Sequence, residues 1–286
     1  MEINKLLEKG VDLIKGREFG NPVLEAILIL SNLLNVDKTY IYTHSKDEVS
    51  QEVGDKYLKL MDKRASGYPV QYILKEREFM GLDFYIEEGV LVPRPDTEIL
   101  VEYIIEYIKE EYSGEKINIL DLGIGSGAIS LSLAYYCRNS EVYGVDIGDI
   151  PLKVANINKE RFNLNNVNFY KGDLFKAIEG LNLEGQFHII ASNPPYIPRE
   201  EINKLQKEVK DFEPRLALDG GKDGLDFYRR ITPKSKNYLV KGGLLIYEIG
   251  YDQGEAVRDI LIKEGFQRIS ILKDLQGLDR VIFGTK

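Results

Sequence analysis

Apolar residues in the first 66 positions recur at the three- and four-residue spacing of amphipathic helices. The first stripe consists of Ile3, Leu6, Leu7, Val11 and Ile14. Similar stripes follow in residues 26–34 and 53–61. Asn21-Pro22 is typical of a helix start, because Asn caps free N–H groups and proline suits the first helical position. The pattern predicts a small bundle of three or four short helices, packed through their apolar faces.

The pattern changes after Gly67-Tyr68-Pro69, which breaks the helical region. Residues 77–92 predict short strands, and a long amphipathic helix is expected to begin near Asp96 or Thr97. Apolar runs and helical stretches such as 128–136 then alternate. The expected strands are 117–122, 141–146, 167–171, 188–192, 244–249, 267–272 and 280–284. This order predicts an α/β, Rossmann-like fold, with a mostly parallel sheet, helices on both faces and an antiparallel edge hairpin.

Composition narrows the classes of partner. The 286 residues are 43% hydrophobic and carry a net charge of −8, which argues against nucleic acid as the main substrate. The single cysteine and two histidines offer no disulfide and no spacing of metal ligands. The start of the chain is polar and the longest apolar run, residues 26–30, is too short to cross a bilayer. A cytoplasmic protein without metal or membrane attachment is expected.

Residues 121–128, Asp-Leu-Gly-Ile-Gly-Ser-Gly-Ala, join a predicted strand to a predicted helix. Glycines there allow a tight turn and a close approach by a ligand, and the helix start presents free N–H groups. Gly123, Gly125 and Ala128 fit a relaxed dinucleotide fingerprint. Gly123, Gly125 and Gly127 fit the spacing typical of methyltransferases. The loop alone therefore indicates a nucleotide-type cofactor without choosing between the two classes.

Two acidic residues end neighbouring strands. A carboxylate at Asp146 can accept hydrogen bonds from ribose hydroxyls, which suits NAD and S-adenosylmethionine equally. Asp173 can accept from an adenine amine, while Leu174 or Phe175 covers the ring. A helix cap at Asp146 and a simple turn at Asp173 are the structural alternatives.

The segment Asn193-Pro194-Pro195-Tyr196 follows the fourth predicted strand, where ligands bind in open α/β sheets. Proline fixes its own backbone and restricts the residue before it, so the segment is stiff. The Asn193 side-chain carbonyl and the Pro194 backbone carbonyl are placed to accept both N–H groups of a planar NH2, and Tyr196 offers a flat face. The segment predicts methylation of such a nitrogen by alignment, without a general base, and leaves amide and adenine both open.

With these residues placed, the sequence resembles the release factor glutamine methyltransferases, a family often called HemK or PrmC. The resemblance covers nearly the whole chain. Besides the glycine loop and the Asn193 segment, it is carried by 69–73, 92–98, 213–218, 223–228, 248–254 and 274–277 with Arg280.

The resemblance implies S-adenosylmethionine-dependent N5-methylation of the glutamine in the Gly-Gly-Gln motif of peptide chain release factors. It implies a helical docking domain (1–75), a β-hairpin linker (76–93) and a seven-stranded methyltransferase domain (94–286). The implied cofactor contacts are Gly123, Ile124, Gly125, Ser126, Gly127, Asp146, Asp173, Leu174 and Asn193. Asn193, Pro194 and Tyr196 are the expected catalytic residues, and together with Pro195 they are the expected substrate contacts.

Two features depart from the family pattern. Residues 147–151, Ile-Gly-Asp-Ile-Pro, replace a simpler helix start and are expected to change how adenosine is held. Leu174 stands where the family often has an aromatic residue, so stacking on adenine is expected to be weaker or to come from Phe175.

Four rivals compete with this interpretation. A sister family methylates a glutamine of a ribosomal protein, but usually differs after Pro93-Arg94. An adenine amino-methyltransferase of DNA needs a basic target-recognition region, which the acidic balance does not favour. An NAD-dependent oxidoreductase has no role for the two prolines. A non-catalytic adaptor leaves both the glycine loop and Asn193 unexplained.

Overall fold

The computed structural model describes residues 1–17 and 20–286; residues 18 and 19, inside the predicted docking domain, lie outside the described residues. The chain forms two compact units. The first contains residues 1–76 and also 206–212, and the second contains residues 77–205 and 213–286. The chain thus returns to the helical unit after most of the sheet has been built.

The helical unit has a core of apolar side chains that include Leu6, Leu30 and Met61, all fully buried. Its helices are α1 (Ile3–Ile14), α2 (Pro22–Leu34), α3 (Lys38–Thr43), α4 (Gln51–Ala65), α5 (Val70–Leu74) and the returning α9 (Lys207–Phe212). The Asn21 side chain accepts a hydrogen bond from Leu24 N at 3.0 Å and caps α2, as the Asn-Pro pair predicted.

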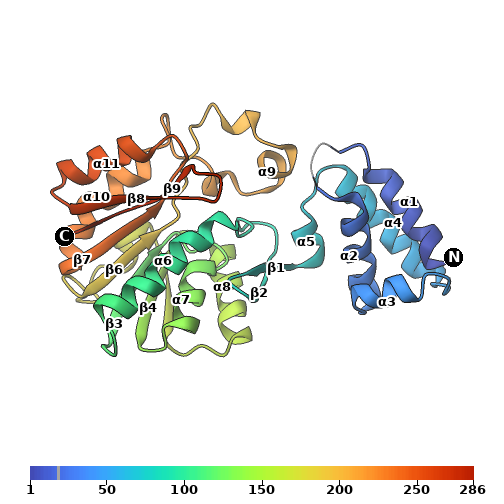
Figure 1. Cartoon of the computed structure of the whole chain (residues 1–286), viewed down its shortest axis with the longest axis horizontal. Coiled ribbons are helices and arrows are strands. Elements are labelled where there is room, and N and C mark those ends of the chain that lie inside the picture. The colour runs from blue at the N-terminus through green and yellow to red at the C-terminus, as the bar shows by residue number, and fades with distance from the viewer. Residues whose placement is uncertain (18–19) are drawn as a thin grey trace. The chain divides into compact units, whose positions relative to one another are not determined.

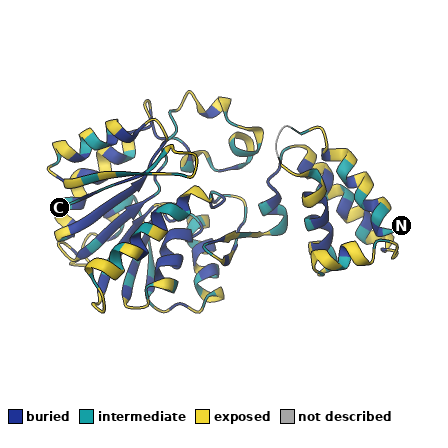
Figure 2. Cartoon of the chain, in the orientation of Figure 1, coloured by how far each residue is buried: buried dark blue, intermediate teal, exposed yellow. Residues whose placement is uncertain are grey.

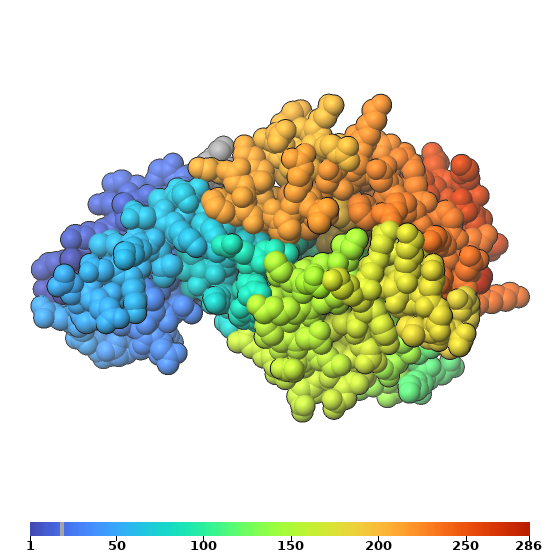
Figure 3. Space-filling model, turned by 180° about the vertical axis from the view of Figure 1, so that it is seen from behind, coloured from blue at the N-terminus to red at the C-terminus, as the bar shows by residue number. Residues whose placement is uncertain are grey.

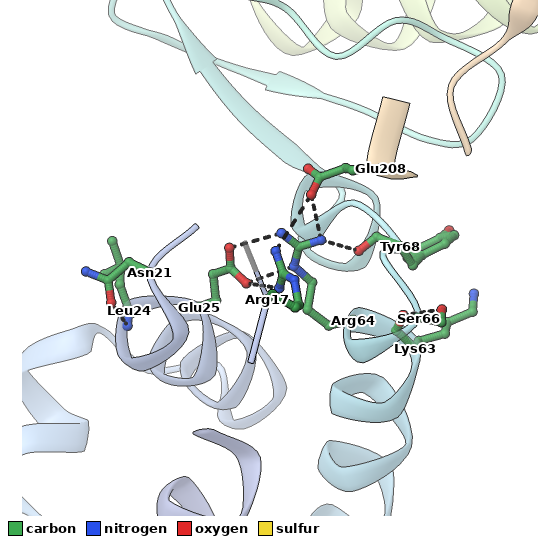
Figure 4. A network of polar contacts seen from close by, with 9 residues as sticks. All are labelled: Arg17, Asn21, Leu24, Glu25, Lys63, Arg64, Ser66, Tyr68 and Glu208. Atoms are coloured by element: carbon green, nitrogen blue, oxygen red, sulfur yellow. Dashed lines mark hydrogen bonds and ion pairs between the residues drawn. The ribbon is translucent and has the colours of Figure 1, made fainter. Parts of the chain in front are cut away.

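A buried network of charges lies where α2, α4 and α9 meet (Figure 4). Arg64 donates to both oxygens of Glu25, from Nε at 2.8 Å and from Nη2 at 3.0 Å. Its Nη1 lies 2.8 Å from Glu208 and donates to the Tyr68 carbonyl at 2.9 Å. Arg17 Nη1 donates to Glu25 at 2.7 Å. Two guanidinium groups, with Arg64 the closer at 2.8 Å and Arg17 at 3.8 Å from Glu208, therefore tie the returning helix to the N-terminal helices.

A seven-stranded sheet organises the second unit (Figure 1). Its strands are β3 (Ile117–Leu122), β4 (Ser140–Asp146), β5 (Val167–Lys171), β6 (Phe187–Ser192), β7 (Leu239–Glu248), β8 (Gln267–Lys273) and β9 (Asp279–Thr285). The order is β5-β4-β3-β6-β7-β9-β8, parallel from β5 to β7 and antiparallel at β9 and β8. This confirms the predicted fold class, including the edge hairpin.

Helices cover both faces of the sheet, so its central strands are buried (Figure 2). One layer contains α6 (Asp96–Glu111), α7 (Ala128–Tyr136) and α8 (Asp149–Arg161); the other contains α10 (Asp226–Tyr238) and α11 (Gly254–Lys263). The remaining elements are a hairpin of β1 (Glu76–Phe79) and β2 (Leu82–Tyr85) and the short 3-10 turns η1 (Leu174–Ala177), η2 (Ile202–Lys204) and η3 (Arg215–Ala217). Burial on both faces explains why the strands are near-continuous apolar runs.

One strand is markedly longer than the sequence predicted, and one helix begins at a position for which no prediction was made. β7 begins at Leu239 rather than Leu244, and a register shift accompanies the polar and glycine residues of its first half. α8 begins at Asp149, immediately after the unusual Ile147-Gly148. Pro151 falls in the first helical turn, where an N–H group has no partner within the helix, so the proline does not interrupt α8.

Candidate active site

A pocket of about 540 Å³ opens at the carboxyl ends of β3, β4, β5 and β6. The sheet order reverses between β3 and β6, which is the point where open α/β sheets bind ligands. All of the lining residues belong to the sheet-containing unit. The surface is hollowed between the yellow-green and orange segments of this unit (Figure 3).

The pocket brings together most of the residues expected from the sequence. Its lining includes Gly123, Ile124, Gly125, Ser126, Asp146, Asp173, Leu174, Asn193 and Pro195. The lining, within the described part of the chain, does not include three expected residues: Gly127, Pro194 and Tyr196. These three are adjacent in sequence to lining residues.

The glycines of the loop after β3 serve two different purposes. A Cβ atom added to Gly123 or Gly125 would meet nothing within 4 Å, and both residues have positive φ. A Cβ on Gly127 would instead lie 2.8 Å from Leu131 Cδ1 and 3.2 Å from Ala155 Cβ. Gly127 therefore lets α7 and α8 pack, whereas Gly123 and Gly125 keep the loop backbone open to a ligand. This open backbone fits a nucleotide-type cofactor.

Two carboxylates hold this loop in place. Asp146 Oδ2 accepts from Gly125 N at 3.0 Å, and Oδ1 accepts from Gly148 N at 2.9 Å. Burial raises the pKa of Asp146 despite these hydrogen bonds. Asp121 is fully buried and accepts from the backbone N of Ser130 at 3.1 Å and from its Oγ at 2.5 Å; burial raises its pKa to about 7. Asp121 thus joins β3 to α7, a role that the sequence did not assign to it.

The end of β5 supplies an apolar lining residue rather than a stacked ring. Leu174 lines the pocket and adopts a left-handed backbone with φ of 53°. Phe175 is buried in the core and stacks on Tyr238, with ring centroids 4.8 Å apart, so the expectation that it covers adenine is wrong. Asp173 lines the pocket, and both its oxygens accept from Arg230 Nη2, at 2.6 and 2.7 Å.

The backbone of the Asn193–Tyr196 segment is anchored on both sides. Ser192 Oγ donates to the Leu122 carbonyl at 2.6 Å, which joins the end of β6 to the end of β3. Gln253 Nε2 donates to the Tyr196 carbonyl at 2.9 Å. A Cβ on Gly224 would lie 2.3 Å from that carbonyl oxygen, so glycine is needed for this close approach. Hydrogen bonds therefore anchor the segment at both of its ends.

Two side chains of the segment contact buried polar groups. Asn193 Nδ2 donates to Thr97 Oγ1 at 3.3 Å, and Tyr196 Oη donates to Glu248 Oε1 at 3.1 Å. Thr97 Oγ1 also donates to Glu248 Oε2 at 2.6 Å. Burial raises the pKa of Glu248, and also that of Tyr196. Sequence reasoning missed Thr97, Glu248 and Gln253 as site residues. A charged residue at the end of the apolar run 244–248 could have indicated Glu248, because carboxyl ends of strands face the site.

Comparison with known proteins agrees with this geometry. The family models that match are the PrmC N-terminal domain over residues 5–74 and a methyltransferase domain over residues 113–245. The release factor glutamine methyltransferase of Clostridium acetobutylicum is 42% identical, over 100% of this chain and 99% of its own. That of Clostridium botulinum is 41% identical, over 100% of both chains. A solved methyltransferase from Pyrococcus furiosus has a TM-score of 0.52 and 21% identity, over 72% of this chain and 90% of its own.

The sheet order, the pocket at its switch point and the matching domain model define a methyltransferase of the Rossmann-like class. The full-length identity to curated relatives is more specific than the fold. The chain belongs to the family of release factor glutamine methyltransferases, which confirms the resemblance seen in its motifs.

Proposed function

We propose that this protein transfers a methyl group from S-adenosylmethionine to the side-chain amide nitrogen, N5, of the glutamine in the Gly-Gly-Gln motif of peptide chain release factors. The observation that carries the proposal is the placement of Asn193, which lies in the pocket beyond β6 with its amide nitrogen bonded to Thr97. The names of the relatives supply the release factor as substrate.

The loop after β3 and the ends of β4 and β5 would hold the cofactor. Gly123 and Gly125 leave the backbone of the 123–127 loop accessible, and the Asp146 carboxylate offers ribose hydroxyls the lone pairs that its backbone donors do not use. Asp173 and Leu174 lie where the adenine is expected, with Leu174 giving apolar contact without ring stacking. When bound, this cofactor supplies a methyl group on a positively charged sulfur, which makes that carbon electrophilic.

The segment after β6 would bind the amide. Asn193 Oδ1 and the Pro194 carbonyl each accept one N–H of the glutamine NH2, and Pro195, which lines the pocket, contacts a flat face of the amide. Tyr196 supports the segment from behind, with its hydroxyl held by Glu248. Two acceptors placed in advance orient the nitrogen and increase its electron density, since an amide lone pair is otherwise delocalised. Alignment of nitrogen and methyl carbon supplies the remaining catalysis, and no general base is required.

The proposed site suggests a separate role for each of three segments of the chain. We assign residues 1–75 to docking of the release factor, 76–93 to the linker and 94–286 to methyl transfer, in the cytoplasm. The described residues include no helix with the length and apolar character of a membrane span. The net charge of −8 favours a protein over a nucleic acid as substrate.

The proposal is tested by offering labelled S-adenosylmethionine and a choice of substrates. A release factor, a ribosomal protein fraction and duplex DNA are incubated separately with the enzyme. Label is expected in the release factor and should disappear when its Gly-Gly-Gln glutamine is replaced by alanine. Label confined to ribosomal protein or DNA would overturn the proposal in favour of the corresponding rival.

A further inference from the structure

The amide of Asn193 is connected to a buried carboxylate through a single hydroxyl. Thr97 Oγ1, at the start of α6, lies 2.6 Å from Glu248 Oε2 and 3.3 Å from Asn193 Nδ2. Thr97 is 5% exposed and Glu248 1% exposed, so water does not compete for these contacts. The three residues come from α6, the end of β7 and the segment after β6, which only the folded sheet brings together.

The direction of these hydrogen bonds follows from the number of hydrogens available. A threonine hydroxyl has one hydrogen and can otherwise only accept. An ionised carboxylate accepts and never donates, so the hydroxyl of Thr97 must give its hydrogen to Glu248. Towards Asn193, Thr97 then offers only lone pairs, which an amide NH2 satisfies and an amide oxygen does not.

Both oxygens of Glu248 act as hydrogen-bond acceptors, which is the pattern of an ionised carboxylate. Each of its oxygens accepts a hydrogen bond, one from Thr97 and the other from Tyr196. Burial raises the pKa of Glu248, but these two hydrogen bonds and the positive charge of Arg280 act against that rise. Tyr196 is fixed in the same way, since its own hydrogen is also committed to Glu248.

We infer that Thr97 and Glu248 are positioning residues that set which end of the Asn193 carboxamide faces the substrate. With Nδ2 turned to Thr97, Oδ1 is left for the substrate NH2. The opposite orientation would present an NH2 group to another NH2 group and would repel the nitrogen that is to be methylated. This inference rests on the proposed function. It adds the contacts that make Asn193 present an acceptor, and so bind a hydrogen-bond donor, at the substrate.

Single-turnover methyl transfer to a release factor, with saturating cofactor, tests the inference in Thr97→Val and Thr97→Ser. Valine keeps the shape but removes the acceptor, so we expect the rate to fall about 10- to 100-fold, the effect of one lost oriented hydrogen bond. Serine keeps the hydroxyl and should restore the rate to within about threefold. Binding of S-adenosylhomocysteine, followed by calorimetry, should change less than about threefold in both variants.

A double-mutant cycle separates positioning from a general structural effect. If Thr97 acts through Asn193, adding Thr97→Val to Asn193→Ala should slow the enzyme no further. Thr232→Val is the matched control, because Thr232 is equally buried and hydrogen-bonded, to Tyr247, but does not line the pocket. Its single-turnover rate should match the wild type.

Three results would overturn the inference. These are an unchanged rate in Thr97→Val, a rate loss fully explained by weaker binding of S-adenosylhomocysteine, or additive losses in the double mutant. Full activity of Asn193→Ala would instead refute the proposed amide clamp itself. An inactive wild type on release factors, with activity on another substrate, would refute the proposed substrate.

Discussion

The two units each bury a glutamate, and the partners of the two side chains differ. Glu25 in the helical unit receives hydrogen bonds from Arg64 and Arg17. Burial raises its pKa, but the two guanidinium groups outweigh burial and hold it below the ordinary value. Glu248 receives hydrogen bonds from the hydroxyls of Thr97 and Tyr196, and burial keeps its pKa raised.

The different partners give Glu25 a structural role and Glu248 a role in orienting other side chains. Arg64 is a rigid fork that ties Glu25, Glu208 and the Tyr68 carbonyl together, and its loss removes the closest cation from two carboxylates. The hydroxyls around Glu248 each carry one hydrogen, so the carboxylate fixes the direction in which they accept from other groups. The first network should therefore govern stability and the second the rate of methyl transfer.

Arg64→Met should give the largest effect on stability. It removes the guanidinium that binds Glu25 and Glu208 most closely and leaves them only Arg17, at 2.7 Å and 3.8 Å. Removing one partner of a buried ion pair typically costs about 3–5 kcal/mol. Urea unfolding followed by circular dichroism measures the loss, with separate transitions for the two units fitted where they occur. A loss below about 1 kcal/mol would show that the network does not hold α9.

The same substitution in both networks sharpens the comparison. In Glu248→Gln the new amide can donate to Thr97, which frees the threonine hydroxyl to turn the Asn193 amide around. The single-turnover rate should fall about 10- to 100-fold, or about 1.4–2.7 kcal/mol. Glu25→Gln should instead lower stability by about 1–3 kcal/mol while the rate stays within about twofold. Equal effects on rate would remove the distinction between the two sites.

Stability as a function of pH should separate the same two variants. The lowered pKa of Glu25 means that its stabilising contribution is present above the unfolded pKa and is lost as pH falls through the folded value. The raised pKa of Glu248 has the opposite sign, so its contribution is fully present at low pH and is lost as pH rises through the folded value. The wild-type minus variant difference in unfolding free energy is measured by urea titrations from about pH 3 to pH 8. It should rise with pH below the unfolded pKa for Glu25, and fall with pH above the unfolded pKa for Glu248.

Lys56→Met should give the smallest effect. Lys56 lies on α4 like Arg64, but its partner Glu52 and its own side chain are 76% and 61% exposed. Exposed pairs of this spacing contribute about 0.3–0.5 kcal/mol, so unfolding should change by no more than that. A loss of unfolding free energy as large as that of Arg64→Met would mean that α4 is sensitive to any substitution. The effect of Arg64→Met could then not be assigned to its buried ion pairs.

Local patterns predicted the sheet and the part of the pocket lining that follows its strands, and long-range contacts determine the rest of the site. The central strands were predictable because each is a short apolar run that both helical layers cover. Gly123, Asp146 and Asn193 were predictable because they lie at the ends of such runs. Thr97 and Glu248 are 151 positions apart, and no local pattern indicates that they meet. Glu208 lies in the short helix α9, which belongs to the helical unit although the residues before and after it belong to the sheet-containing unit. Only tertiary packing determines that placement.

Phe175 shows a different reason for failure. The sequence places an aromatic residue one position after Leu174, but the left-handed backbone at Leu174 directs the chain so that Phe175 packs into the core. The residue that lines the pocket is then the leucine. A one-residue change in direction of this kind depends on backbone geometry, and residue type alone does not predict it.

The central claim is that the Asn193 side chain binds the amide that is methylated. Its most direct test is the single-turnover rate of Asn193→Ala on a release factor, measured beside the affinity for S-adenosylhomocysteine. We expect the rate to fall by at least about 10²–10³-fold, comparable to the removal of one preorganised polar group from an active site, with cofactor binding at least partly retained. A variant that transfers the methyl group at the wild-type rate would contradict the account.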